Sequence, residues 1–202
     1  MYKHTYKLAA VGAALALFAG GAFAQAGSST NMFGGPIYSG APALNVTAAL
    51  VEAGGGAENF SFAKALVSML GEKNVNAEVA KLTKQYGKAD VNTFITGMDY
   101  AVKDALKRAT EQGIKLPPPA KLHGTALASV LVTAGTAPDG VFWSGYLFDH
   151  ALSHGIHNQV MDDINKNVST EADMTTHKLL NQAMYDVAHK LGHTHVKLAS
   201  LH

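Results

Sequence analysis

The sequence contains no cysteine. This absence excludes disulfide bonds, thiolate zinc sites, iron–sulfur clusters, a cysteine nucleophile and haem attachment through a CxxCH motif. It also excludes a lipoprotein anchor, which needs a cysteine directly after the signal. We therefore expect a soluble mature protein with no stable membrane anchor.

Charge is also scarce. Only 15% of the 202 residues are charged, the net charge is +1, and no run of lysine or arginine occurs. The sequence therefore lacks the clustered positive charge that is typical of nucleic-acid-binding proteins. The apolar content of 48% is typical of a folded protein, and the length fits one compact domain with additional ends.

The chain has no hydrophobic run long enough for a comfortable membrane span, which needs about 20 predominantly apolar residues. Its most apolar stretch, residues 8–21, follows Lys3 and Lys7 and precedes the small-residue site Ala22-Phe23-Ala24. A positive segment, a short apolar segment and an A-x-A site in this order are typical of a secretory signal peptide. We expect residues 1–24 to be removed and the protein to be periplasmic or secreted.

Most of the chain after residue 24 has the spacing of apolar residues that is typical of α-helices. Residues 25–41 are rich in Gly, Ser and Pro and predict a flexible leader. From 42 to 192, apolar residues recur at spacings of three and four, with Asp90 and Thr170 as expected N-caps and glycines as stops. The prediction is an all-α single domain of about eight short helices, packed as an irregular bundle or in a globin-like way, followed by a tail at 193–202.

Histidine is concentrated in the last third of the chain, where eight of the ten lie between residues 150 and 202. His150 and His154 are four apart, so on one helix their rings would project from the same face, a spacing that suits two imidazoles on one metal ion. Trp143 precedes them on the same stripe, and His157 follows as a third candidate ligand. Asp149, Asp162 or Asp163 could orient an imidazole by accepting its second N–H.

His177 is the other candidate, because it falls on the apolar stripe of the expected last helix. If that helix packs against the 142–164 stretch, His177 could face His150 or His154, and two facing imidazoles in an apolar setting suit a non-covalent haem b. Zinc is a further cofactor candidate, and nearby methionines would suit copper. The competing interpretation is that such histidines are core residues bonded to a carbonyl or an aspartate. His189, His193 and His195 are predicted to be solvated.

No HExxH, GxSxG, Walker A, GxGxxG or EF-hand pattern occurs in the sequence. The hypothesis is an exported binding protein that holds a metal ion or haem through His150, His154, His157 and His177, with Trp143 lining the cofactor. Two alternatives stay open: a structural or interaction protein of the cell envelope without a cofactor, and a His/Asp metal-dependent enzyme. A small ligand is possible as a partner, and the residues do not decide whether catalysis occurs.

Overall fold

The computed structural model describes residues 41–134, 136–137, 140–141 and 151–192. Within these ranges the chain forms seven α-helices and one pair of two-residue strands, so the predicted all-α class is confirmed for this part of the chain. The elements in chain order are α2 (Ala41–Ala53), α3 (Phe62–Leu70), α4 (Glu72–Tyr86), α5 (Lys88–Glu111), α6 (Gly124–Ala134), β1 (Thr136–Ala137), β2 (Gly140–Val141), α8 (His154–Asn167) and α9 (Thr170–Lys190).

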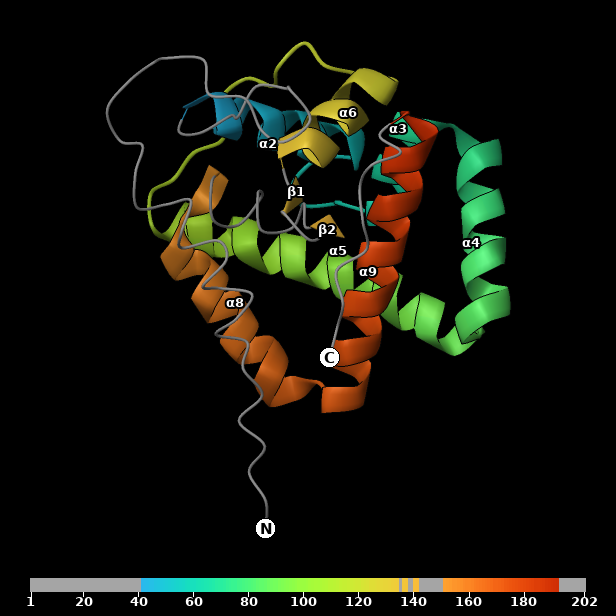
Figure 1. Ribbon diagram of the computed structural model, residues 1–202. Helices are drawn as coiled ribbons and strands as arrows, with labels where there is room; N and C mark the ends of the chain where they lie inside the picture. Colours follow the sequence, from blue (N-terminus) through green and yellow to red (C-terminus); the bar gives the residue numbers. More distant parts are fainter. Residues whose placement is uncertain (1–40, 135, 138–139, 142–150, 193–202) are drawn as a thin grey trace.

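Helix α5 is the longest of the described elements, and α3, α4, α8 and α9 pack against it. Figure 1 shows α9 crossing α5 at a steep angle, with α8 beside one end of α5 and α4 beside the other. Apolar residues at spacings of three and four give α5 a continuous buried face. The buried residues are Val91, Phe94, Met98, Ala101, Val102, Ala105, Leu106 and Ala109.

Helices α2, α3 and α6 pack on one another and form the other side of the core. Phe62 of α3 meets Phe94 of α5 edge to face, with ring centroids 5.5 Å apart. The backbone N–H of Phe62 donates to Oδ1 of Asp99 at 2.5 Å, while Ser61 Oγ accepts from the N–H of Lys64. These contacts satisfy N–H groups of the first turn of α3, which have no partner within the helix.

Glycines set the boundaries between α3, α4 and α5. Gly71 and Gly87 have positive φ angles of 80° and 89°, a conformation that glycine adopts without steric penalty, and each ends one helix one residue before the next begins. The N-cap predicted at Asp90 is therefore wrong: α5 starts at Lys88, and Asp90 lies in its first turn. The cap predicted at Thr170 is wrong by one residue, because Ser169 Oγ accepts from the N–H of Ala172.

A short hairpin interrupts the helices. β1 and β2 are antiparallel, with Thr136 opposite Val141 and Ala137 opposite Gly140. The antiparallel pairing places Gly140 directly beside Ala137. β2 packs against α9.

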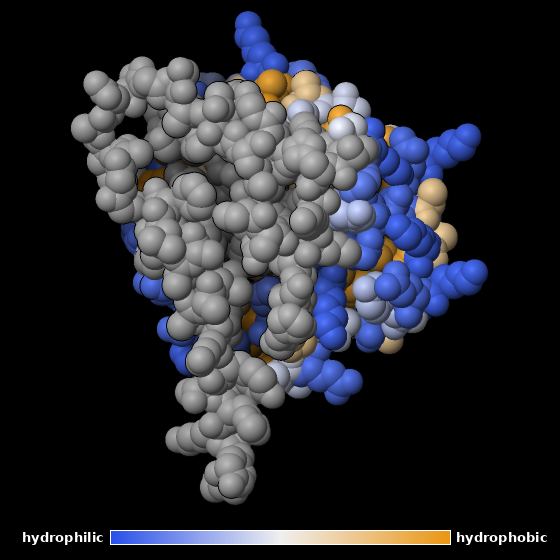
Figure 2. Space-filling view, in the orientation of Figure 1, coloured by the Kyte–Doolittle hydropathy of each residue, from blue (hydrophilic) through white to orange (hydrophobic). Residues whose placement is uncertain are grey.

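Among the described residues, no helix combines the length and apolar character that crossing a bilayer requires. Figure 2 shows mainly hydrophilic side chains on the coloured part of this face. In the described part of the chain, the exposed large hydrophobic residues are Val67 and Tyr100, at 37% and 52%. They lie on different helices, α3 and α5, so each is an isolated apolar contact with solvent.

Candidate functional site

His177 lies on α9 in direct contact with Asp173, one turn earlier. Its Nδ1 is 2.9 Å from the carbonyl oxygen of Asp173 and 3.1 Å from Oδ1 of the same residue. Since both partners are acceptors, Nδ1 carries the proton in this contact. The side chain of His177 is 19% exposed and that of Asp173 is 13% exposed, so the contact is largely removed from water.

Burial and the aspartate act on His177 in opposite directions. Burial of the ring lowers its pKa, but the hydrogen bonds to the carboxylate and carbonyl of Asp173, with the negative charge nearby, outweigh burial and raise the pKa above its usual value of 6.5. The aspartate therefore orients the ring and favours its protonated form.

His177 belongs to a set of residues that recur every fourth position along α9, which we call the α9 polar row. Positions four apart on a helix lie on one slowly turning face. The rings of Tyr185 and His189 are in contact in this row, with centroids 4.1 Å apart and planes tilted by 41°. The row consists of Asp173, His177, Asn181, Tyr185 and His189.

Two polar atoms of this row are buried without a hydrogen-bond partner, Oδ1 of Asn181 and Nε2 of His189. The prediction that His189 is a solvated surface residue is therefore wrong, because its ring lies against Tyr185 and Nε2 is shielded from water. Sequence reasoning missed Asn181 and Tyr185 altogether. The fourfold spacing from Asp173 to His189 was the signal that could have found them.

His154 is the first residue of its helix, and the residue before it is not helical. Helix α8 begins at His154, and its N-cap Ser153 is extended, with φ 177° and ψ 155°. Ser153 Oγ accepts from the N–H of Ile156, which fixes the helix start at this point. The prediction that one helix carries both histidines is therefore wrong, and the argument from a shared helix face no longer applies to this pair.

The remaining predicted ligands are described only in part. His157 is half-buried in the first turn of α8, and its backbone N–H donates to the carbonyl of Ser153 at 3.1 Å. Trp143, Asp149 and His150 lie outside the described residues, as does the side chain of His154. The predicted meeting of these residues with His177 stays a prediction.

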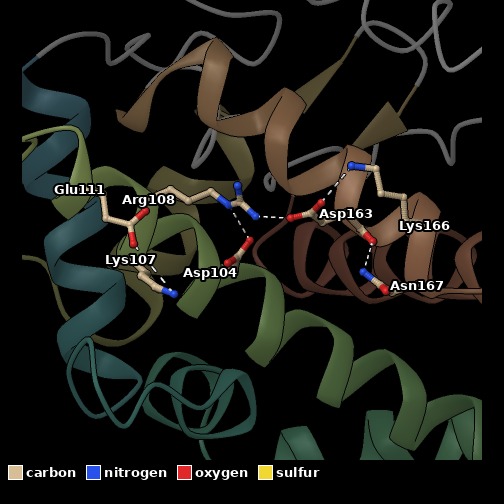
Figure 3. Close-up of polar contacts among 7 residues, drawn as sticks. All are labelled: Asp104, Lys107, Arg108, Glu111, Asp163, Lys166 and Asn167. Atoms are coloured by element: carbon tan, nitrogen blue, oxygen red, sulfur yellow. Dashed lines mark hydrogen bonds and ion pairs between the residues drawn. The ribbon is translucent and has the colours of Figure 1, made fainter.

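Asp163 contacts the side chains of Arg108 and Lys166, and no contact with the imidazole of a histidine in the described residues is seen. Figure 3 shows the guanidinium of Arg108, from α5, between Asp104 of the same helix and Asp163 of α8. Lys166 Nζ adds a contact of 3.4 Å to Asp163, while Asp162 is exposed. The hydrogen bonds from Arg108 and Lys166 lower the pKa of the Asp163 carboxyl. This cluster joins α5 to α8.

A second charged cluster joins α4 to α9. Lys81 Nζ lies 2.8 Å from Asp186 Oδ2, and Lys190 Nζ lies 2.9 Å from Glu78 Oε1. Burial, together with the neighbouring Asp186, raises the pKa of the Glu78 carboxyl. Burial alone would raise the pKa of the Asp186 carboxyl, but its hydrogen bonds with Glu78 and Lys81 outweigh burial and lower that pKa.

In the part of the chain that the structure describes, no group of three or more His, Asp or Glu side chains is arranged to hold a metal ion. Comparisons with protein-family models, curated proteins and solved structures found no match.

Among the hollows between the described helices, two differ in character. One, of about 10 Å³, is lined only by apolar side chains from α3, α6 and α9, including Phe62, Leu131 and Met184. The other, of about 140 Å³, is lined by polar residues near the starts of α5 and α9, including Asp90 and Glu171. The apolar hollow has room for about one water molecule, so it has no room for a porphyrin.

Proposed function

We propose that this chain is an exported helical binding protein that holds a metal ion or a non-covalent haem through its histidines. His177 is the ligand from the described part, His150, His154 and His157 are its partners, and Trp143 lines the cofactor. The proposal keeps the predicted organisation: a signal at 1–24, a leader at 25–41, a single irregular helical domain at 42–192 and a tail at 193–202. The mature protein is periplasmic or secreted.

The observation that carries the proposal is the packing of β2 against α9. β2 ends at Val141, two residues before Trp143, and α9 holds His177. At the other end of the segment, Ala151 and Leu152 are buried, 6% exposed each, directly after His150. Both neighbours of residues 142–150 are thus attached to the helical body, which supports an approach of this segment to α9.

The contact between Asp173 and His177 also supports a ligand role. A metal-binding histidine usually donates its other ring N–H to a carboxylate or a carbonyl, which fixes its tautomer and orientation. His177 makes both contacts through Nδ1. In the neutral ring, Nε2 then carries the lone pair that a metal binds.

Purification of the exported protein, followed by absorbance and elemental analysis, tests the proposal. A Soret band indicates haem, and stoichiometric zinc or copper indicates a metal site. The cofactor should be lost in H150A, H154A and H177A and kept in H123A, because His123 is exposed and is not among the proposed ligands. Wild-type protein without metal or haem, both as purified and after incubation with either, contradicts the proposal.

A specific observation favours a second candidate, a structural or interaction protein of the envelope. Nδ1 of His177 bonds the carbonyl of its own helix, as an ordinary core histidine does. In that case H177A lowers stability and removes no cofactor. A metal-dependent enzyme would use the same histidines, and turnover in a substrate screen would have to disappear together with the metal.

A further inference from the structure

Helix α4 buries far fewer of its residues than the long helices α5 and α9. Two of its 15 residues, Val75 and Leu82, are buried, whereas eight of 24 are buried in α5 and eight of 21 in α9. Figure 1 shows α4 alongside α9, with its two ends joined to α3 and α5. Since burial of apolar surface is the main force that holds a helix on its neighbours, α4 is the long helix that separates most easily.

A single glycine separates α4 from the helix on each side. Gly71 has φ 80° and ψ 146°, and Gly87 has φ 89° and ψ 156°, backbone angles that are essentially restricted to glycine. A Cβ at either position would meet no atom within 4 Å apart from its chain neighbours, so no side chain packs against these joints. The two glycines therefore have the freedom that a hinge requires at each end of α4.

Two ion pairs join α4 to α9. Lys81 Nζ lies 2.8 Å from Asp186 Oδ2, and Lys190 Nζ lies 2.9 Å from Glu78 Oε1. The side chains of Lys81 and Lys190 are 53% and 32% exposed. Because the lysines reach water, dissolved salt screens both pairs.

The two carboxylates in these pairs differ in how well their oxygens are satisfied. Asp186 has a donor at each oxygen, since Gln182 Nε2 donates to Oδ1 at 3.0 Å and Lys81 Nζ donates to Oδ2. Oε2 of Glu78 is buried and has no hydrogen-bond partner among the described residues. Burial and the neighbouring Asp186 also raise the pKa of the Glu78 carboxyl, so the packed helix disfavours its charge.

We infer that α4 is a hinged helix, which opens away from α5 and α9 as one unit about Gly71 and Gly87 while α5 and α9 stay folded. The ion pair between Lys81 and Asp186 holds α4 closed. The negative charge of Glu78 weakens the closed arrangement, so ionic strength and these side chains set how often α4 opens.

Opening exposes surface that the closed arrangement hides. It uncovers the apolar contacts of Val75 and Leu82 and frees the carboxylate of Asp186, which is 8% exposed when α4 is closed. The inference does not rest on the proposed function, because none of these residues is a proposed metal or haem ligand.

Native-state hydrogen exchange on the exported protein tests the inference. The backbone amides of residues 76–86 in α4 should exchange together and with lower protection than those of residues 98–109 in α5. Raising the NaCl concentration from about 0.05 M to about 0.5 M should speed exchange in α4 more than in α5, because salt screens the ion pairs that hold α4 closed.

Four substitutions show which side chains control the opening. K81A and K84A are a matched pair, because both lysines are exposed on α4 and Lys81 is the one that contacts Asp186. K81A and D186N should each speed exchange in α4 about fivefold, and K84A should not. E78Q replaces the unpaired oxygen with an amide that can donate to Asp186, and should slow exchange.

A control on another pair of helices is D163N, which removes the ion pair between α5 and α8 and should leave exchange in α4 unchanged. Equal protection of α4 and α5 in the wild type would show that α4 opens only when the protein unfolds, and would overturn the inference. Equal effects of K81A and K84A would overturn the role of the ion pair, and faster exchange in E78Q would overturn that of Glu78. If D186N does not fold, K81A and the salt dependence decide, since Lys81 is exposed.

Discussion

Asp173 holds His177 through two acceptors at once, its carbonyl oxygen at 2.9 Å and its carboxylate at 3.1 Å from Nδ1. The pKa of His177 is raised despite burial of the ring, so the folded protein binds this proton more tightly than the unfolded chain does. The resulting stabilisation is fully present below pH 6.5, the usual value, and is lost as the pH rises through the folded pKa.

Asp173→Asn should therefore remove part of the pH dependence of folding. In metal-free protein, we expect the wild type to lose stability as the pH rises from 6.5 through the folded pKa of His177, and the variant to lose less over the same range. Imidazole NMR titration should show a lower His177 pKa in D173N, with the resonance of the exposed His123 unaffected by the substitution. An unchanged His177 titration would show that the carboxylate does not control the ring.

The ion pair between Arg108 of α5 and Asp163 of α8 can be tested by comparing substitutions of Asp163 and of its neighbour Asp162. Asp163 contacts Arg108 and Lys166, whereas Asp162 is exposed. D163N should lower the free energy of unfolding more than D162N does, and the difference should shrink as salt is added, because exposed pairs are screened. Since the pKa of Asp163 is lowered, its contribution is present above pH 3.8 and is lost as the pH falls through the folded value. Equal effects of the two substitutions in urea denaturation would contradict this assignment.

Local signals in the sequence predicted the helices well. The glycines at 71, 87, 113 and 192 were expected as stops, and each has a positive φ angle at a helix end. Such boundaries are predictable because the residue type itself determines which backbone angles cost little. The N-cap predicted at Asp90 was wrong because Gly87 occupies the N-cap position and α5 begins at the next residue, Lys88.

Pairings distant in sequence could not be predicted in this way. Arg108 and Asp163 are 55 residues apart, and Lys81 and Asp186 are 105 apart, so no periodicity joins them. The break at Ser153 was missed because the fourfold spacing of His150 and His154 suggested a continuous helix, whereas a serine favours the N-cap position. The α9 polar row was missed because His177 was considered with its apolar neighbours and not with Asp173 and Asn181.

The start of α9 distinguishes two neighbouring hydroxyl side chains. Ser169 Oγ accepts from the N–H of Ala172 at 3.2 Å, whereas Thr170 is the first helical residue. S169A should lower the free energy of unfolding by about 1 kcal/mol, the usual cost of losing an N-cap. T170A should change it by less than about 0.5 kcal/mol, as exposed substitutions do. Thermal or urea denaturation of both variants checks the order, and a larger loss in T170A would move the cap back to Thr170.

Two glycines should respond in opposite directions to the addition of one methyl group. A Cβ on Gly54 would lie 2.5 Å from two ring carbons of Phe60, which is 1% exposed and cannot move without disturbing the core. G54A should therefore destabilise the protein by about 1–3 kcal/mol through overpacking. A Cβ on Gly97, inside α5, would meet only Thr176 at 3.9 Å, an ordinary contact. G97A should stabilise the protein by about 0.5–1 kcal/mol, because alanine loses less backbone entropy than glycine in a helix. Urea denaturation of the pair measures both effects, and a shift of the two midpoints in the same direction would contradict the packing around Gly54 or Gly97.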